Sequence, residues 1–129
     1  MSGKALVDTN IVIALFAGDP AIAENLKQQE SLFLCVPVLG ELLYGVMASA
    51  RVESNLERLN KFVHSVLLLP CDAWTATVYG KVKFEQRKKG RPIPENDIWI
   101  AAVARQHGLT LLTRDEHFHE ISDLEVEIV

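Results

Sequence analysis

The stretch Ala5-Leu6-Val7-Asp8-Thr9-Asn10 joins a short apolar run to a carboxylate and two residues that favour helix starts. The apolar run suits a buried β-strand, and Thr9 and Asn10 are good N-cap residues for a helix expected over residues 11–17. A strand that runs directly into a helix is the first half of a βαβ unit, whose second strand lies parallel to the first. The stretch therefore predicts an α/β fold with Asp8 at the carboxyl end of the first strand.

The rest of the chain repeats this alternation. Apolar runs predict further strands over residues 32–36, 66–69 and 109–113, of which the strand over 66–69 is expected to be short and buried, and an edge strand over 124–129. The spacing of apolar residues predicts helices over residues 21–30, 38–47, 51–64, 72–89 and 96–108. Short strands that alternate with helices indicate a parallel sheet covered on both faces. We therefore expect an α/β/α sandwich with a short, mostly parallel central sheet flanked by helices.

Two of the predicted helices have identifiable starts. Asp72 is expected to cap the helix over residues 72–89, whose buried face would hold three apolar residues: Trp74, Val78 and Val82. Asn96 or Asp97 is expected to cap the helix that follows, because the two prolines of residues 90–94 exclude helix there.

Length and composition indicate an ordered globular protein. The 129 residues suffice for one domain, residues 1–129, that buries about two thirds of its unfolded surface. Hydrophobic residues make up 49% of the chain and charged residues 23%, which argues against disorder. The few apolar residues before Asp8 are too short a run for a signal-peptide core, and no run approaches the roughly 20 residues of a membrane span. We expect a cytoplasmic protein without a membrane segment.

The net charge of −4 conceals a basic segment. Residues 81–91 contain one acid and six basic residues, so this window carries +5: Lys81, Lys83, Glu85, Arg87, Lys88, Lys89 and Arg91. A basic stripe beside an acidic metal site suits an enzyme that cleaves phosphate esters. Lys83, Arg87 and Lys88 are therefore candidates for contacting a nucleic acid, and an ordinary solvated helix face is the alternative.

Four acidic residues stand where the chain leaves a strand or enters a helix: Asp8, Glu41, Asp97 and Asp115. Ligands of open parallel sheets bind beyond the carboxyl ends of the strands, so these four positions are expected to meet in one crevice. Two like charges about 4 Å apart repel by roughly 4 kcal/mol at an effective dielectric of about 20, so the cluster needs a counter-charge. We expect Mg²⁺, with Mn²⁺ as a substitute, because oxygen ligands suit hard ions.

Such a cluster suits metal-assisted hydrolysis of a phosphodiester. A bound cation lowers the pKa of a water ligand and stabilises charge on the leaving oxygen, so no protein nucleophile is required. The sequence has no nucleophile elbow and no P-loop. Cys35, within an apolar run, is expected to be a buried free thiol, and neither it nor Cys71 has an obvious histidine partner.

Each acid also has a purely structural explanation. Asp8 and Asp115 suit turns, Asp97 suits a helix N-cap, and Glu41 suits an exposed position on a helix. The four fall at the same end of the predicted sheet, and this joint placement favours the metal role.

Polar neighbours of the acids are candidates for supporting them or binding substrate: Asn10, Thr113 and Arg114. Thr113 is expected to hydrogen-bond a carboxylate or a phosphate. Arg114 is a candidate phosphate clamp, with a surface ion pair as its alternative. His117 and His119 lie close to Asp115 in the sequence and are candidate proton carriers, but ordinary packing is the expectation for both.

Four blocks of sequence carry a resemblance to a known family: Leu6-Val7-Asp8-Thr9-Asn10, Gly40-Glu41-Leu42-Leu43-Tyr44-Gly45, Pro92-Ile93-Pro94-Glu95-Asn96-Asp97-Ile98-Trp99-Ile100-Ala101-Ala102 and Leu112-Thr113-Arg114-Asp115-Glu116-His117-Phe118. In this order and at these intervals they resemble the PIN-domain ribonucleases and, within them, the VapC toxins of bacterial and archaeal toxin–antitoxin pairs. The resemblance spans essentially the whole chain. It implies a single PIN domain in which Asp8, Glu41, Asp97 and Asp115 are the metal-binding acids.

The resemblance also implies an activity and partners. The activity is Mg²⁺-dependent endonucleolytic cleavage of RNA, which in several family members is a structured RNA such as tRNA or ribosomal RNA. The partners are a second copy, forming a homodimer, and a cognate VapB-like antitoxin that inserts a segment into or near the acidic site. The apolar excess over residues 11–17 and 38–47 suits a dimer surface, although buried core is the default interpretation.

Other functions remain compatible with parts of the sequence. One is a PIN-type RNA-processing nuclease without an antitoxin. Another is a non-catalytic protein that binds RNA or a partner, although four intact acids would repel phosphate unless a metal is present. A phosphatase or receiver domain with Asp8 as a covalent nucleophile usually needs a second acid nearby, and Asn10 stands at the expected position.

Overall fold

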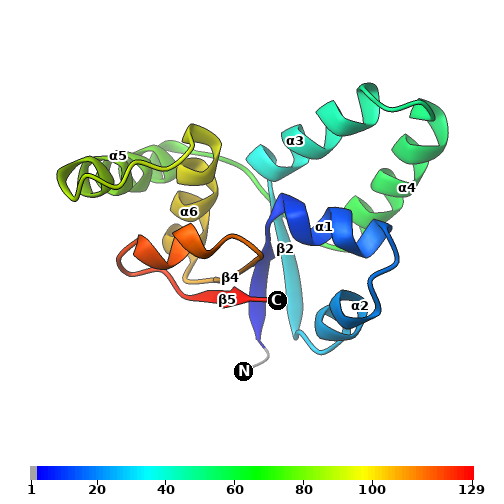
Figure 1. The fold of residues 1–129 in the computed structure, drawn as a ribbon, viewed down its shortest axis with the longest axis horizontal. Helices are drawn as coiled ribbons and strands as arrows, with labels where there is room; N and C mark the ends of the chain where they lie inside the picture. The colour runs from blue at the N-terminus through cyan, green and yellow to red at the C-terminus, as the bar shows by residue number, and fades with distance from the viewer. Residues whose placement is uncertain (1–2) are drawn as a thin grey trace.

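A five-stranded parallel sheet forms the centre of the protein (Figure 1). The structure is a computed structural model that describes residues 3–129. In chain order its elements are β1 (Lys4–Val7), α1 (Thr9–Phe16), α2 (Pro20–Lys27), β2 (Ser31–Cys35), α3 (Val36–Met47), α4 (Val52–His64), β3 (Leu67–Leu69), α5 (Ala73–Lys88), α6 (Glu95–His107), β4 (Thr110–Thr113), the 3₁₀ helix η1 (Glu116–Glu120) and β5 (Val126–Ile128). The α/β/α sandwich predicted from the sequence is confirmed, and its sheet is parallel throughout.

The strand order β3-β2-β1-β4-β5 places a topological switch point between β1 and β4. The chain first adds β2 and β3 on one side of β1, and then adds β4 and β5 on the other side. At such a point the connections leave toward opposite faces, which opens a crevice beyond the strand ends. The backbone N–H of Asp8 still donates to the carbonyl oxygen of Leu112 at 2.9 Å, so β1 and β4 remain paired up to the crevice.

The helices form two groups on opposite sides of the sheet, with α1–α4 in one and α5, α6 and η1 in the other (Figure 1). The neighbouring strands β1 and β4 are the most deeply buried part of the sheet: Leu6 of β1 and Leu111 of β4 are completely buried. The core continues into α6, where residues 100–104 are all buried. None of the helices in residues 3–129 is both long and apolar enough to cross a membrane.

Some sequence-based expectations about burial and boundaries are wrong. The run at residues 66–69 forms β3 at the edge of the sheet, where Leu67 and Leu68 are exposed, because an edge strand has one neighbour only. Trp74 does not face inward but is 72% exposed, whereas Val82 is buried as expected. The helix expected from Asn96 or Asp97 begins at Glu95, with Pro94 at its N-cap, so neither residue caps it. Asp72 does cap α5, in a reciprocal pair with Thr75.

Candidate active site

Four acidic side chains approach one another at the crevice between β1 and β4. Asp8 directly follows β1 and Asp115 follows β4, so both come from the carboxyl ends of adjacent parallel strands. Asp97 comes from the first turn of α6 and Glu41 from the middle of α3. Their charges act on one another: those of Asp97 and Asp115 raise the pKa of Asp8, and those of Glu41 and Asp115 raise the pKa of Asp97.

Asp8 is the most deeply buried member of this carboxylate cluster, at 3% exposure. Its Oδ1 accepts from the backbone N–H of Thr9 at 2.7 Å, and its Oδ2 accepts from the hydroxyl of Thr113 at 2.6 Å. Burial raises the pKa of Asp8 to about 6, and these two hydrogen bonds oppose the shift. A buried carboxylate with both oxygens engaged has a fixed orientation.

Asp97 is held by the start of α6 rather than acting as its cap. The backbone N–H of Asp97 donates to the carbonyl oxygen of Pro94 at 3.0 Å, and the Asn96 amide donates to the carbonyl oxygen of Pro37 at 3.3 Å. The second bond ties α6 to the beginning of α3. Burial raises the pKa of Asp97, and the neighbouring His117 opposes that shift.

Glu41 reaches the cluster from an exposed position on α3. The hydroxyl of Thr9 donates to Glu41 Oε1 at 2.8 Å, which links the first residue of α1 to the middle of α3. Thr9 was expected only to favour the start of a helix. A hydrogen bond between residues 32 positions apart leaves no local pattern in the sequence, so this role of Thr9 was missed.

Asn10 and Thr113 hold the segment that carries Asp115. The Asn10 side chain donates to Asp115 Oδ2 at 3.4 Å and accepts from the backbone N–H of Arg114 at 3.2 Å. The Thr113 hydroxyl accepts from the backbone N–H of Asp115 at 3.0 Å, in addition to donating to Asp8. Consecutive residues Asp8, Thr9 and Asn10 thus contact three different parts of the site.

Arg114 forms a surface ion pair with Asp19, which the sequence analysis gave as the alternative to a phosphate clamp. Its guanidinium donates to Asp19 Oδ2 at 2.7 Å, and this hydrogen bond lowers the pKa of Asp19. Asp19 also caps α2 by accepting from the backbone N–H of Ala21. Arg114 therefore fastens the loop after β4 to the start of α2.

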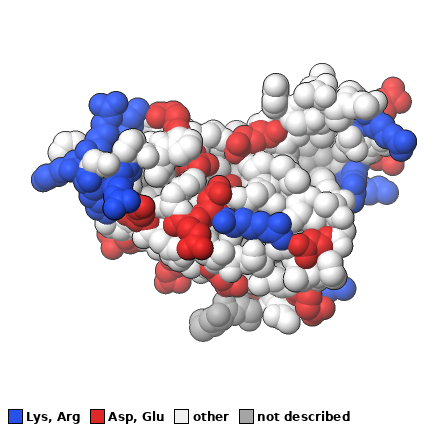
Figure 2. Space-filling model, in the orientation of Figure 1, with Lys and Arg blue, Asp and Glu red and all other residues white. Residues whose placement is uncertain are grey.

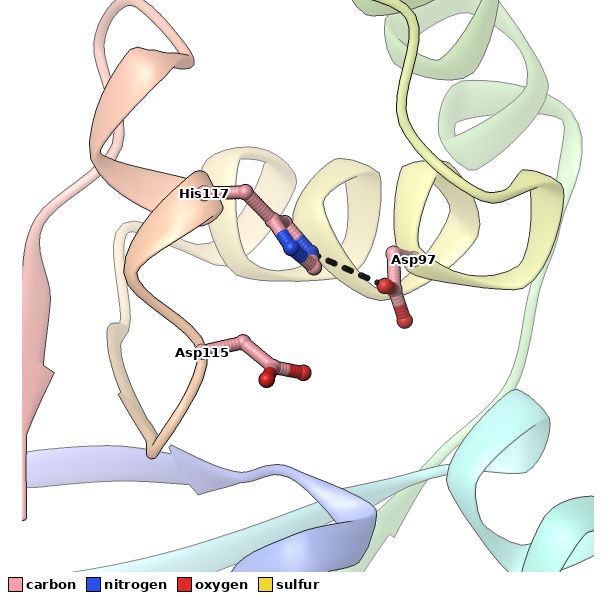
Figure 3. Close-up of side chains that lie close together, drawn as sticks. All are labelled: Asp97, Asp115 and His117. Atoms are coloured by element: carbon pink, nitrogen blue, oxygen red, sulfur yellow. Dashed lines mark hydrogen bonds and ion pairs between the residues drawn. The ribbon is translucent and has the colours of Figure 1, made fainter.

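His117 is turned toward the acids, so the expectation of ordinary packing is wrong for this residue. Its Nε2 lies 3.0 Å from Asp97 Oδ2, and one ligand atom each of His117, Asp97 and Asp115 lie within 4.8 Å of one another. Figure 3 shows the imidazole and both carboxylates directed into the same space. His119, by contrast, is exposed.

The basic residues of α5 lie apart from the acids. Figure 2 shows Lys and Arg side chains gathered over α5 at one end of the molecule, with acidic side chains nearer the middle. Lys83 is not free: its Nζ lies 3.1 Å from Glu95 Oε2 and also donates to the hydroxyl of Tyr79. Arg87 and Lys88 are exposed at the end of the helix.

The cysteine thiols do not supply a nucleophile to this site. Cys35 is a buried free thiol, as expected, and burial raises its pKa to about 12. Burial also raises the pKa of Cys71, which is likewise free. A protonated thiol is a poor nucleophile, so the carboxylates are the groups with chemistry to offer.

The carboxylate cluster fits a divalent cation. Burial and neighbouring like charges raise the pKa of Asp8 and of Asp97, and an added cation would relieve both effects. The available donors are carboxylate oxygens with one imidazole nitrogen at the rim, a set that suits Mg²⁺ or Mn²⁺.

Comparisons with known proteins agree with this architecture. The PIN domain family matches residues 5–124. The chain is 34% identical to the tRNA(fMet)-specific endonuclease VapC of Shigella flexneri and 33% identical to ribonuclease VapC2 of Haemophilus influenzae, in each case over 96% of both chains. Among solved structures, VapBC2 of Rickettsia felis bound to a promoter DNA fragment contains a chain with a TM-score of 0.90 and 29% identity, covering 98% of both chains. DNA-bound VapBC of Salmonella typhimurium also gives a TM-score of 0.90, at 27% identity over 99% of this chain and 98% of that one.

The sheet order, the switch-point site and these full-length similarities lead to one assignment. The chain belongs to the PIN-domain family and, within it, to the VapC ribonucleases.

Proposed function

We propose that this protein is a metal-dependent endoribonuclease and the toxin of a type II toxin–antitoxin pair. The observation that carries the proposal is the convergence of Asp8, Glu41, Asp97 and Asp115 at the switch point of the sheet. The named relatives support it, since they include an endonuclease specific for tRNA(fMet) and several ribonucleases. The four carboxylates hold Mg²⁺, for which Mn²⁺ can substitute.

Each residue of the site has a separate task in hydrolysis. The four acids would hold a divalent cation, which when bound would supply an activated water and stabilise charge on the leaving oxygen. Asp8, fixed by Thr9 and Thr113, keeps one carboxylate in place before substrate arrives. Asn10 orients Asp115. Such prior orientation lowers the cost of organising the reacting groups.

RNA approaches over α5, where Arg87 and Lys88 are exposed. The acids alone would repel the phosphate backbone, so basic side chains at a distance supply the attraction. Lys83 contributes less than the sequence suggested, because Glu95 neutralises it.

A VapB-like antitoxin binds in a groove between α1, α3 and α4. The groove has a volume of about 300 Å³, and its lining includes the apolar residues Ile13, Phe16 and Leu42 together with Glu41. An apolar segment bound in it would lie beside one of the four acids. Ile13→Glu should abolish neutralisation by the antitoxin while cleavage is kept; neutralisation at the wild-type level would place the antitoxin elsewhere.

The protein is also proposed to form a homodimer. A stripe of apolar side chains on α3 remains exposed and continues past the groove: Val36, Tyr44 and Met47 are 44%, 75% and 68% exposed. Light scattering on the partner-free protein should give twice the chain mass, and Tyr44→Glu should lower it. A monomeric wild type at micromolar concentration would refute the dimer.

The test of the proposed activity is an RNA-cleavage assay. Partner-free protein is incubated with total cellular RNA in Mg²⁺ or in EDTA, beside Asp97→Asn and the matched variant Asp123→Asn. Asp123 is 86% exposed and has a positive φ that asparagine tolerates. Discrete fragments should form in Mg²⁺ alone and fall about 10³-fold in rate in Asp97→Asn, equivalent to roughly 4 kcal/mol. Fragments that persist in EDTA or in Asp97→Asn would refute the mechanism.

A further inference from the structure

We propose that His117 is itself a ligand of the bound metal and strengthens the binding of Mn²⁺ more than that of Mg²⁺. The proposal rests on the metal-dependent function proposed above. It adds a nitrogen donor to a site otherwise built from carboxylate oxygens, and it identifies the residue that selects the ion.

The separation between ligand atoms fits a shared cation. Two neighbouring ligands of an ion with bonds of about 2.1 Å are about 3.0 Å apart, and opposite ligands about 4.2 Å apart. His117 Nε2 and Asp97 Oδ2 are 3.0 Å apart, and the set formed with Asp115 spans no more than 4.8 Å. The imidazole and the two carboxylates point into one space rather than past one another (Figure 3).

The position of His117 is fixed by the fold. Asp115 occupies the N-cap position of η1 without a side-chain capping hydrogen bond, and His117 is the second residue of this short helix. Phe118 is completely buried, with its ring centroid 4.7 Å from that of His117, so η1 is anchored to the core beside the imidazole. Among residues 3–129 the imidazole has one hydrogen-bond partner, Asp97, and Nε2, the atom that faces this carboxylate, coordinates a cation only in the tautomer that leaves Nε2 without a proton.

A different role for His117 would produce the same geometry. The imidazole could donate a hydrogen bond to Asp97 and merely hold that carboxylate, as outer partners of metal ligands commonly do. The two roles differ in their effect on ion preference. Loss of a positioning bond weakens all ions alike, whereas loss of a nitrogen ligand weakens Mn²⁺ more than Mg²⁺, because Mg²⁺ prefers oxygen donors.

The test measures metal binding rather than cleavage. Calorimetric titrations with Mn²⁺ and with Mg²⁺ are made on the partner-free full chain as wild type, His117→Gln and His119→Gln. Glutamine keeps an N–H donor for Asp97 and offers oxygen in place of imidazole nitrogen. His119 is the matched control, because it is an exposed histidine on the same short helix.

The expected result is a selective loss. Mn²⁺ affinity should fall about tenfold or more in His117→Gln, Mg²⁺ affinity should change much less, and His119→Gln should match the wild type. Equal losses for both ions, or no loss for either, would overturn the ligand role.

Pulsed electron paramagnetic resonance of bound Mn²⁺ gives an independent reading. Coupling to an imidazole ¹⁴N should be present in wild type and His119→Gln and absent from His117→Gln. Nitrogen coupling that persists in His117→Gln would also overturn the proposal. Failure of the wild type to bind either ion would instead refute the metal-dependent function on which the proposal rests.

Discussion

The carboxyl edge of the sheet and the outer face of α5 are both rich in polar side chains, yet they are constructed in opposite ways. At the sheet edge, Asp8 and Thr113 are buried, three of the four carboxylates accept hydrogen bonds, and the fourth, Asp97, lies 3.0 Å from His117 Nε2. On α5, Trp74 and Phe84 are 72% and 67% exposed, while polar Gln86 is buried against the rest of the protein. The edge is organised before any ligand arrives, and the helix face is left open.

This difference predicts how the two regions respond to substitution. Hydrogen bonds at the sheet edge join residues as far apart as Asp8 and Thr113, so a change there alters both stability and chemistry. A change on the outer face of α5 removes solvated side chains and should alter binding alone.

The largest expected effect is on the pH dependence of stability, and Asp8→Asn should reduce it. The pKa of Asp8 is about 6 in the folded protein against an ordinary 3.8, so between these pH values the folded state keeps a proton that the unfolded chain has lost. The metal-free protein therefore loses stability as pH rises from about 4 to 6, by roughly 3 kcal/mol from this group. Urea unfolding in EDTA should show this slope in the wild type and a weaker one in Asp8→Asn. Identical slopes would mean that Asp8 ionises normally.

Thr113→Val should have an intermediate effect. The substitution keeps shape but removes the hydroxyl that donates to Asp8 and accepts from the backbone N–H of Asp115, so unfolding free energy should fall by about 1–3 kcal/mol. Cleavage should fall about 10-fold to 100-fold as the metal-binding acids lose orientation. Thr110→Val, in the same strand but bonded to Glu125, is the control for both measurements. If the two variants behave alike, Thr113 has no special role.

The smallest effect should come from the double replacement of Arg87 and Lys88 by alanine. Folding should be unchanged, and the slope of log affinity against log salt concentration should become shallower by about 1.5 as two phosphate contacts are lost. Replacing Lys27 and Lys61, exposed lysines on α2 and α4, makes the same change in net charge and should leave the slope unaltered. Equal salt dependence of RNA affinity in the two double variants would mean that the basic residues of α5 are ordinary solvated side chains.

The two regions also differ in how well the sequence predicted them. The meeting of Asp8 and Asp115 was predictable because each follows a short apolar run, and parallel strands bring their carboxyl ends to one edge. The orientation of His117 was not predictable, since it depends on a 3₁₀ turn and on the burial of Phe118.

On α5 the predicted buried stripe is correct at two of its three positions. Val82 is buried and Val78 packs against the core, whereas Trp74 is 72% exposed and its neighbour Thr75 is completely buried. The Thr75 hydroxyl donates to Gln106 of α6, so a polar contact occupies a place assigned to an aromatic ring. Periodicity gives the repeat of a helix but does not indicate which face meets its neighbour when both faces are mixed.

The pairing of β1 with β4 also determines at which stage of protein synthesis the site can first form. The strands are neighbours in the sheet, yet the Thr113 hydroxyl that holds Asp8 lies 105 residues further along the chain. Synthesis delivers the N-terminal elements first, so β1, β2 and α3 leave the ribosome long before β4. A growing chain lacks both Asp115 and the hydroxyl that fixes Asp8 until those last strands are made. The proposed catalytic centre therefore cannot be complete before β4 and Asp115 have been synthesised.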